Sequence, residues 1–254
     1  MKIVCIGSGN VATHLAIAFK RIGAELVQVW SRDRRSAEIL AALTKAKAIT
    51  DWKELDLKAD CYLIAVKDDA IPEVAAHLKD VSGIVIHTSG ATDMKVLAGS
   101  PAGYGVIYPL QTFSKTKAVD LTQVPLCIEA DQPQVLEKIS AIAHLISPLV
   151  SEASSEQRRV LHLAAVFACN FSNHLYALSS QLLEQHQLKF DLLKPLILET
   201  AQKIQSSLPA DVQTGPAVRN DQETLKNHMA LLSGSPELLN IYEVLSDSIK
   251  KMHL

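Results

Sequence analysis

Short, continuously apolar runs alternate with helical patterns over the first ~150 residues of the chain. Runs such as Val4-Cys5-Ile6 are apolar at every position rather than at every second one, which is typical of strands buried on both faces. We predict six strands: Lys2–Ile6, Glu25–Trp30, Cys61–Val66, Gly83–His87, Tyr104–Tyr108 and Pro125–Glu129. Four helices are predicted between them: Asn10–Ile22, Arg34–Leu43, Ile71–Leu78 and Pro133–Ile146. This alternation indicates an α/β domain with a doubly wound parallel sheet.

The pattern changes after Ser147-Pro148, where a polar stretch begins. From Ser151 onward we expect no strand. Four helical segments are predicted instead: Ser155–Glu184, Phe190–Leu208, Asp221–Leu232 and Pro236–Lys251. The chain is therefore expected to have two domains, an α/β domain over residues 1–150 and an all-helical domain over residues 151–254.

Composition excludes several classes of protein. The chain has 254 residues, 48% of them hydrophobic, and a net charge of −2, which argues against disorder and against a basic nucleic-acid-binding surface. The charge-free stretch Val160–Leu183 contains His and Asn residues that would be costly in a membrane, so it predicts a buried helix. The four cysteines lie in apolar runs and form no C-x-x-C pair. We expect buried thiols, a cytoplasmic protein without a signal peptide, and no metal site.

A glycine-rich turn follows the first predicted strand. Gly7-Ser8-Gly9-Asn10-Val11-Ala12 matches the pattern G-x-G-x-x-[G/A] and opens a helix. Gly7 permits the tight turn, Gly9 allows a diphosphate to approach the backbone, and the helix start offers free N–H groups. The sequence therefore predicts a Rossmann-like domain that binds a dinucleotide, although a turn shaped only by chain geometry is the alternative.

The end of the second predicted strand indicates which dinucleotide is bound. NAD sites usually place an acidic residue there to bind the ribose 2′-hydroxyl, whereas this chain has Ser31 followed by Arg32. A hydroxyl and a guanidinium suit a 2′-phosphate, so we predict NADP rather than NAD. In the alternative interpretation, Ser31 caps the next helix and the arginine is solvated.

Three further loops follow predicted strands at the edge where ligands of open α/β sheets bind. Val66 is expected to line the cofactor near the adenine or its ribose, while Asp68 and Asp69 beside it fit either a lining or a capping role. Ser89 is expected near the nicotinamide ribose or the substrate, with His87 a weaker candidate. Tyr108 precedes a proline at the end of a buried strand and is a candidate proton donor, although packing alone would also explain it.

The helical half offers two groups of candidates. At 100° per residue, Asn173, Asn170 and His174 lie about 20°, 80° and 120° from His162, which gathers polar side chains on one side of an otherwise apolar helix. His162 and Asn170 are therefore expected to line a substrate cleft, or to join an internal polar network. Arg219 has a guanidinium suited to a substrate carboxylate or a cofactor phosphate, or to a structural ion pair. Beside it, Asn220 and Glu223 have capping-box spacing, which predicts Asn220 as an N-cap.

Together these features resemble a bacterial family that joins a Rossmann-like domain, labelled NADP oxidoreductase, coenzyme F420-dependent, to a DUF2520 domain. The resemblance is carried by the glycine turn, Ser31-Arg32, His87-Thr88-Ser89-Gly90, Pro109 with Phe113, His162 with Asn170, and Thr214-Gly215-Pro216-Ala217-Val218-Arg219-Asn220-Asp221. It implies a helical domain that often packs against its counterpart in a dimer. Relatives by fold include pyrroline-5-carboxylate reductase, prephenate dehydrogenase and the β-hydroxyacid dehydrogenases. Tyr108 departs from the His that prephenate dehydrogenases often carry before this proline, and the helix Val160–Leu183 lacks the catalytic Lys of β-hydroxyacid dehydrogenases.

The leading hypothesis is an NADP(H)-dependent oxidoreductase that transfers a hydride to or from a small organic substrate in a cleft between the domains. Asn170, Tyr108, His162 and Arg219 are the candidates for substrate orientation and proton transfer. We expect a homodimer through the helical domain, with no nucleic-acid or membrane partner. A non-catalytic NADP sensor or scaffold is the competing hypothesis, and a methyltransferase that uses S-adenosylmethionine is a third.

Overall fold

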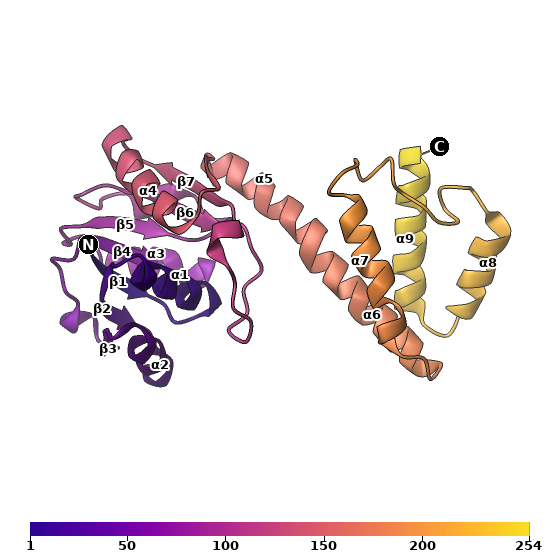
Figure 1. Ribbon diagram of the computed structural model, residues 1–254, viewed down its shortest axis with the longest axis horizontal. Helices are drawn as coiled ribbons and strands as arrows, with labels where there is room; N and C mark the ends of the chain where they lie inside the picture. The colour runs from indigo at the N-terminus through magenta and orange to yellow at the C-terminus, as the bar shows by residue number, and fades with distance from the viewer. Residues whose placement is uncertain (254) are drawn as a thin grey trace. The chain divides into compact units, whose positions relative to one another are not determined.

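The computed structural model describes residues 1–253, so of the predicted helical domain only residue 254 lies outside it. The chain divides into two compact units, Met1–Asn170 and Phe171–Leu254. The first unit holds one eight-stranded sheet with the order β3-β2-β1-β4-β5-β6-β7-β8 (Figure 1). The strands are β1 (Lys2–Ile6), β2 (Glu25–Trp30), β3 (Lys47–Ile49), β4 (Cys61–Ile64), β5 (Ile84–His87), β6 (Tyr104–Pro109), β7 (Leu126–Ala130) and β8 (Val150–Glu152).

The helices α1 to α4 connect strands of the first unit, α5 follows the last strand, and the helices of the second unit follow one another along the chain. They are α1 (Asn10–Arg21), α2 (Arg34–Thr44), α3 (Ile71–Ala76), α4 (Pro133–Ile146) and α5 (Ser155–Ala165) in the first unit, and α6 (Ser172–Gln185), α7 (Lys194–Lys203), α8 (Gln222–Leu231) and α9 (Pro236–His253) in the second. No helix within residues 1–253 combines the length and the apolar character that crossing a membrane requires.

The predicted fold class is confirmed, because all six predicted strands are present and most pairs are parallel. The one antiparallel pair is β6 with β7, where Ile107 lies opposite Ile128. Two short strands were not predicted. β3 has three residues and no apolar run, and β8 pairs with the first three residues of β7, beginning with Val150 opposite Leu126. The expectation of no strand from Ser151 onward is therefore wrong, because the short edge strand β8 includes Ser151 and Glu152.

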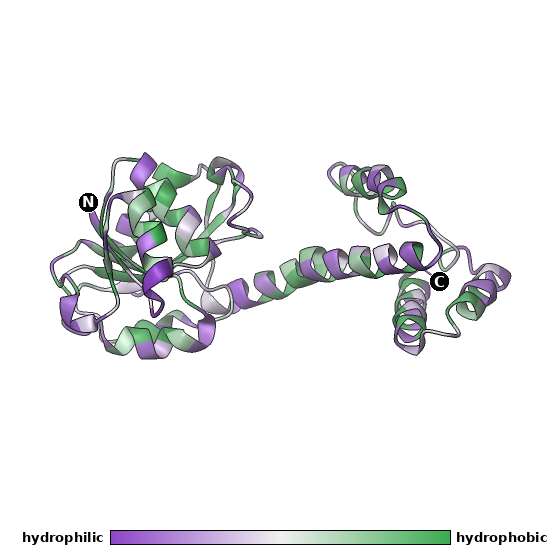
Figure 2. Ribbon diagram, turned by 90° about the horizontal axis from the view of Figure 1, so that it is seen from below, coloured by the Kyte–Doolittle hydropathy of each residue, from purple (hydrophilic) through white to green (hydrophobic). Residues whose placement is uncertain are grey.

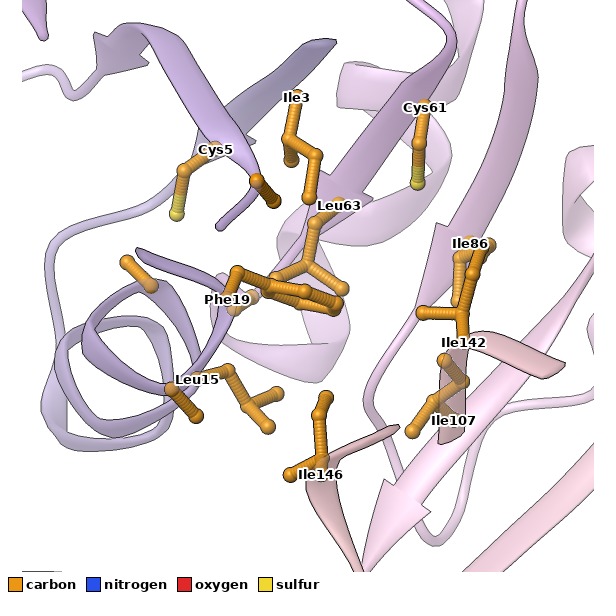
Figure 3. Packing of buried hydrophobic residues seen from close by; sticks show 14 of the residues in the cluster. Ile3, Cys5, Leu15, Phe19, Cys61, Leu63, Ile86, Ile107, Ile142 and Ile146 are labelled. Carbon is orange, nitrogen blue, oxygen red and sulfur yellow. The ribbon is translucent and has the colours of Figure 1, made fainter. Parts of the chain in front are cut away.

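The sheet is covered on both faces, as its continuously apolar strands predict. On one face, Ile3 and Cys5 of β1 pack against α1, α2 and α4, with Phe19 of α1 fully buried among them (Figure 3). On the other face, the alternate residues Val4 and Ile6 pack toward α3 and the short helical turn Met94–Leu97. Both faces of the central strands are thus shielded from water.

The sheet order reverses beside β1, whose two parallel neighbours are β2 and β4. At such a switch point the connections leave toward opposite faces, and a crevice opens beyond the carboxyl ends of the strands. The carboxyl ends of β1, β2, β4, β5 and β6 lie at one edge, because β1 pairs in parallel with β2 and β4, β4 with β5, and β5 with β6. This edge is where a ligand is expected.

The predicted helix Ser155–Glu184 is helical over that length, but it is not one regular α-helix. A π-helical segment, Val166–Phe171, separates α5 from α6. Because a π-helix has more residues per turn, angles counted at 100° per residue from His162 do not hold beyond Ala165. The angles predicted for Asn170, Asn173 and His174 therefore change, and the polar stripe stays a prediction. The predicted burial of the helix is wrong, since Val160, Leu163 and Cys169 are exposed in this chain.

Candidate functional site

A pocket of about 680 Å³ lies at the carboxyl ends of β1, β2, β4, β5 and β6. That volume is typical of pockets that bind small molecules and cofactors. All nine residues predicted to bind the cofactor line it: Gly7, Ser8, Gly9, Asn10, Val11, Ser31, Arg32, Val66 and Ser89. Tyr108 and His162 line the same pocket. The structure thus gathers eleven of the thirteen predicted site residues around one space.

The glycine turn at the pocket has the geometry that a diphosphate needs. Gly7 has a φ of +120°, and a Cβ there would lie 2.2 Å from the carbonyl oxygen of Ala65, so only glycine fits. At Gly9 a Cβ would meet nothing within 4 Å, and the start of α1 has neither a side-chain cap nor an acidic residue in its first turn. The first N–H groups of α1 therefore face open space, as an anion site at a helix start requires.

The end of β2 carries groups suited to a 2′-phosphate. Ser8 Oγ donates a hydrogen bond to Ser31 Oγ over 2.9 Å, which orients both hydroxyls at the pocket. The nearby Asp33 carboxylate accepts from the backbone N–H of Ser36 over 2.8 Å and caps α2, and this hydrogen bonding lowers the pKa of Asp33. The alternative interpretation, in which Ser31 is the helix cap, is therefore wrong. Ser31 and the exposed Arg32 remain available to a ligand.

The segment after β5 is fixed by its own hydrogen bonds. His87 is fully buried, and its Nδ1 accepts from the backbone N–H of Ser89 over 3.1 Å. Burial, together with the charge of Arg158, lowers the pKa of His87 to about 4, so its imidazole is neutral with the proton on Nε2, which has no partner among the described residues. His87 does not line the pocket. Its role is to hold the backbone of Ser89.

Ser89 uses its hydroxyl within the same loop. Its Oγ accepts from the backbone N–H of Ala91 and of Thr92 and donates to Thr92 Oγ1 over 3.0 Å. The side chain thus shapes the turn that exposes Gly90 to the pocket. Any contact that Ser89 makes with a ligand would compete with these bonds.

Arg158, on α5, anchors this loop and was missed from the sequence. Its side chain is fully buried. Its Nε donates to the carbonyl of Ser89 over 3.0 Å, and one of its terminal nitrogens donates to the carbonyl of Thr92 over 2.5 Å. The other pairs with Glu129 of β7 at 2.5 Å, and Glu129 also accepts from Ser155 at the start of α5. The available signal was an arginine one turn before His162, within the predicted helix Ser155–Glu184.

Tyr108 and His162 form a hydrogen-bonded pair at the pocket. Tyr108 Oη lies 3.1 Å from His162 Nδ1, and the two rings meet edge to face. A Cβ on Gly90 would lie 2.7 Å from Cζ of Tyr108 and 2.8 Å from Nδ1 of His162, so both rings rest on this glycine. Burial raises the pKa of Tyr108, and the phenol therefore remains protonated at neutral pH. The arrangement presents a proton donor beside a second titratable group.

The other two predicted site residues are not part of this pocket's lining. Asn170 is exposed in the π-helical segment, and Arg219 is exposed in the second unit. The predicted capping role of Asn220 is wrong, because Asp221 caps α8 by accepting from the backbone N–H of Thr224. Asn220 instead adopts a left-handed conformation with a φ of 52°. No cluster of His, Cys, Asp and Glu able to hold a metal occurs within residues 1–253.

Two family models match separate parts of the chain. Residues 2–89 match "NADP oxidoreductase coenzyme F420-dependent", and residues 124–249 match the domain of unknown function DUF2520. A search of curated proteins found no match.

Solved structures resemble the whole chain. The crystal structure of putative NADP oxidoreductase BF3122 from Bacteroides fragilis is 43% identical, with 98% of each chain covered and a TM-score of 0.93. Protein TM1727 from Thermotoga maritima is 22% identical over 100% of this chain and 98% of its own, with a TM-score of 0.75. An imine reductase from Myxococcus stipitatus in complex with NADP+ is 18% identical over 99% and 92%, with a TM-score of 0.61. The last two share the fold.

Proposed function

The chain belongs to the family of NADP oxidoreductases that carry a DUF2520 domain, its cofactor is therefore NADP, and we propose that it transfers a hydride between NADP(H) and a small organic substrate. One observation carries the proposal. The hydrogen-bonded pair Tyr108–His162 lines the same pocket as the open glycine turn Gly7–Val11. A cofactor held at that turn would share the pocket with a proton donor.

The pocket residues fit NADP at both of its phosphate groups. The free N–H groups at the start of α1, reached over Gly9, suit the diphosphate. Ser31 and Arg32 at the end of β2 suit the 2′-phosphate, and Asp33 is occupied in capping α2. Val66 lines the pocket from the end of β4, where the adenine-side ribose is expected, and Ser89 lines it from the β5 end. When bound as NADPH, the cofactor supplies the hydride.

Proton transfer is assigned to Tyr108. In a reduction, a carbonyl oxygen or an imine nitrogen gains a proton as the adjacent carbon gains the hydride. The phenol of Tyr108 is protonated at neutral pH and carries the proton for that step. His162 Nδ1, 3.1 Å away, is placed to pass a proton to the phenol afterwards. Asn170 and Arg219, which do not line this pocket, stay proposed as substrate-binding residues, the amide as a hydrogen-bond donor and the guanidinium as a partner for a carboxylate.

The fold neighbours favour a substrate with a C=N or C=O bond. They include imine reductases, a reductive aminase from Aspergillus terreus in complex with NADPH and ethyl-5-oxohexanoate, and a pyrroline-5-carboxylate reductase from Coxiella burnetii. We extend this class of substrate to the present chain because a phenol donor suits both bonds. A cytoplasmic location belongs to the same proposal, since the reaction draws on NADPH.

Oxidation of NADPH by purified protein tests the function. The protein is incubated with NADPH and a panel of cyclic imines, keto acids, and amine–ketone pairs, with coenzyme F420 as an alternative hydride acceptor. Turnover with one class of substrate supports the proposal. Tight NADPH binding without oxidation on any member of the panel would favour the sensor hypothesis. Calorimetry with S-adenosylmethionine tests the methyltransferase hypothesis, which requires binding of that ligand alone.

The second unit supports the further proposal of a homodimer. Among its described residues, the buried apolar side chains are Ala217, Leu225 and Leu232. Large apolar side chains remain exposed on its helices, including Leu196 at 63% and Leu231 at 74%. Figure 2 shows hydrophobic and hydrophilic residues alternating along these helices. A unit of this size needs a larger core than these three residues provide. We infer that a second copy of the chain covers this surface.

Sedimentation of wild type and of Leu196→Glu tests the dimer. We expect a dimeric wild type and a dissociated variant, because a carboxylate would be buried without a partner in an apolar interface. Gln202→Glu places the same charge at an exposed position on the same helix and should remain dimeric. A monomeric wild type at micromolar concentration would overturn the proposal.

A further inference from the structure

The loop between β6 and β7 is fastened to the first two turns of α1. Asn10 Nδ2 donates to the carbonyl of Phe113 over 2.8 Å, and His14 Nε2 donates to the carbonyl of Ser114 over 3.0 Å. The rings of His14 and Phe113 also pack together, with centroids 5.0 Å apart. Two consecutive carbonyls of the loop are thus held against the helix whose start forms the glycine-turn anion site.

These contacts place Lys115 at the tip of a tight turn. The backbone N–H of Lys117 donates to the carbonyl of Ser114 over 3.3 Å, and the hydroxyls of Ser114 and Thr116 lie 2.7 Å apart. Lys115 occupies the second position of this turn and lines the pocket together with Gly9 and Asn10. Its ammonium group makes no hydrogen bond or ion pair within residues 1–253, and its side chain is exposed.

We propose that Lys115 binds the cofactor diphosphate, and that the hydrogen bonds between its loop and α1 hold Lys115 in place for this contact. A helix start offers a partial charge of about half a unit, whereas the diphosphate carries about two negative charges. The first turn of α1, Asn10–Thr13, contains no basic side chain. An ammonium acting as a point charge completes the neutralisation.

The loop's attachment decides which phosphate Lys115 binds. Phe113 and Ser114 are held by Asn10 and His14 of α1, and no hydrogen bond links Lys115 or these two residues to the Ser31–Asp33 segment in the described chain. The other end of the pocket already has Arg32 as its cation. Lys115 therefore belongs to the diphosphate and Arg32 to the 2′-phosphate. Lys67, which also lines the pocket without an ion pair among the described residues, is the rival for the same role.

Calorimetric titrations with three probes separate these roles. NADPH carries both phosphate groups, NADH lacks the 2′-phosphate, and adenosine 2′-monophosphate lacks the diphosphate. Lys115→Ala should weaken NADPH and NADH by the same factor, about tenfold, and leave adenosine 2′-monophosphate unchanged. Arg32→Ala should weaken NADPH and adenosine 2′-monophosphate but spare NADH. Lys117→Ala, two residues along the same loop and outside the pocket lining, is the matched control and should bind all three as wild type does.

Several results would overturn the role of Lys115. These are unchanged NADPH and NADH affinity in Lys115→Ala, a loss confined to NADPH, or a loss that Lys67→Ala reproduces in full while Lys115→Ala does not. The inference rests on the cofactor of the proposed function, yet its failure is separate. If wild type binds NADPH and Arg32→Ala behaves as expected, only the role of Lys115 is lost. A wild type that binds neither nicotinamide coenzyme would overturn both.

A double-mutant cycle tests the attachment itself. His14 does not line the pocket, so His14→Ala should weaken NADPH only through the loop, by a few-fold. Because His14 and Lys115 then act through one element, the double variant should lose less affinity than the product of the two single losses. Fully multiplicative losses would show that the loop does not deliver Lys115.

Discussion

Arg158 and His162 lie one helical turn apart on α5, and both meet the short segment Ser89–Gly90. Arg158 Nε donates to the Ser89 carbonyl over 3.0 Å, and a Cβ on Gly90 would lie 2.8 Å from His162 Nδ1. The guanidinium therefore holds both the loop on which His162 rests and the helix from which it projects. This connection sets the position of the pair formed by His162 and Tyr108.

Loss of the Arg158 side chain should destabilise the first unit. Arg158→Met leaves Glu129 and the carbonyls of Ser89 and Thr92 without their partner in a buried setting, and breaking such a buried pair costs about 3 to 5 kcal/mol. Urea unfolding measures the loss. Arg159→Met, which removes an exposed arginine 3.8 Å from Asp93, should cost less than about 1 kcal/mol. Equal stability of the two variants would contradict the anchoring role.

Removal of the Tyr108 hydroxyl should separate chemistry from cofactor binding. Tyr108→Phe keeps the ring on Gly90 but deletes the proposed proton donor, so we expect turnover of the substrate found in the panel to fall about 10²-fold or more. The NADPH dissociation constant, measured by calorimetry, should change less than about twofold. Tyr104→Phe on the same strand, outside the pocket, should leave both unchanged. Full turnover by Tyr108→Phe would exclude Tyr108 as the donor.

The sequence predicted the elements whose signal is local. A strand buried on both faces is apolar at every position, so β1 and β4 are evident from composition alone, and the turn at Gly7–Ala12 follows from the need for a glycine at a φ of +120°. The nine proposed cofactor-binding residues come together because each lies in or just after such a strand. Order along the chain then places them at one edge of the sheet.

The features that were missed depend on contacts distant in sequence. β8 forms because Val150 finds Leu126 on a neighbouring strand, and its own residues carry no apolar run. The π-helical segment changes the spacing of Asn170 from His162 without a proline or glycine to signal it. From the sequence alone, Arg158 is expected at the surface. Its burial follows from its contact with Glu129, which lies 29 positions earlier in the chain. Polar side chains whose hydrogen-bond partners lie far away in the sequence are therefore the least predictable part of this site.

Arg32 should determine the preference between the two coenzymes. Because Arg32 is expected to contact only the 2′-phosphate, Arg32→Ala should weaken NADPH about 10- to 100-fold and change NADH less than about twofold. Fluorescence titration of both coenzymes measures the ratio. Arg35→Ala on α2, whose side chain is exposed and outside the pocket lining, is the matched control. Equal losses for NADPH and NADH would remove the assignment of Arg32 to the 2′-phosphate.

His87 should make the stability of the first unit fall in mildly acidic solution. Its pKa is about 4 in the folded protein against about 6.5 in an unfolded chain, so between these values the unfolded state binds a proton that the folded state does not. The stabilisation is complete above pH 6.5 and is lost progressively as the pH falls toward 4, by about 3 kcal/mol in all.

The variant His87→Asn tests this pH dependence. Its amide oxygen can replace Nδ1 as acceptor for the Ser89 N–H, but it does not titrate. Urea unfolding at pH 7 and at pH 4.5 should show the variant losing about 2 to 3 kcal/mol less than wild type over that range. Parallel pH profiles for wild type and His87→Asn would mean that the buried imidazole gains its proton as readily in the folded protein as in the unfolded chain.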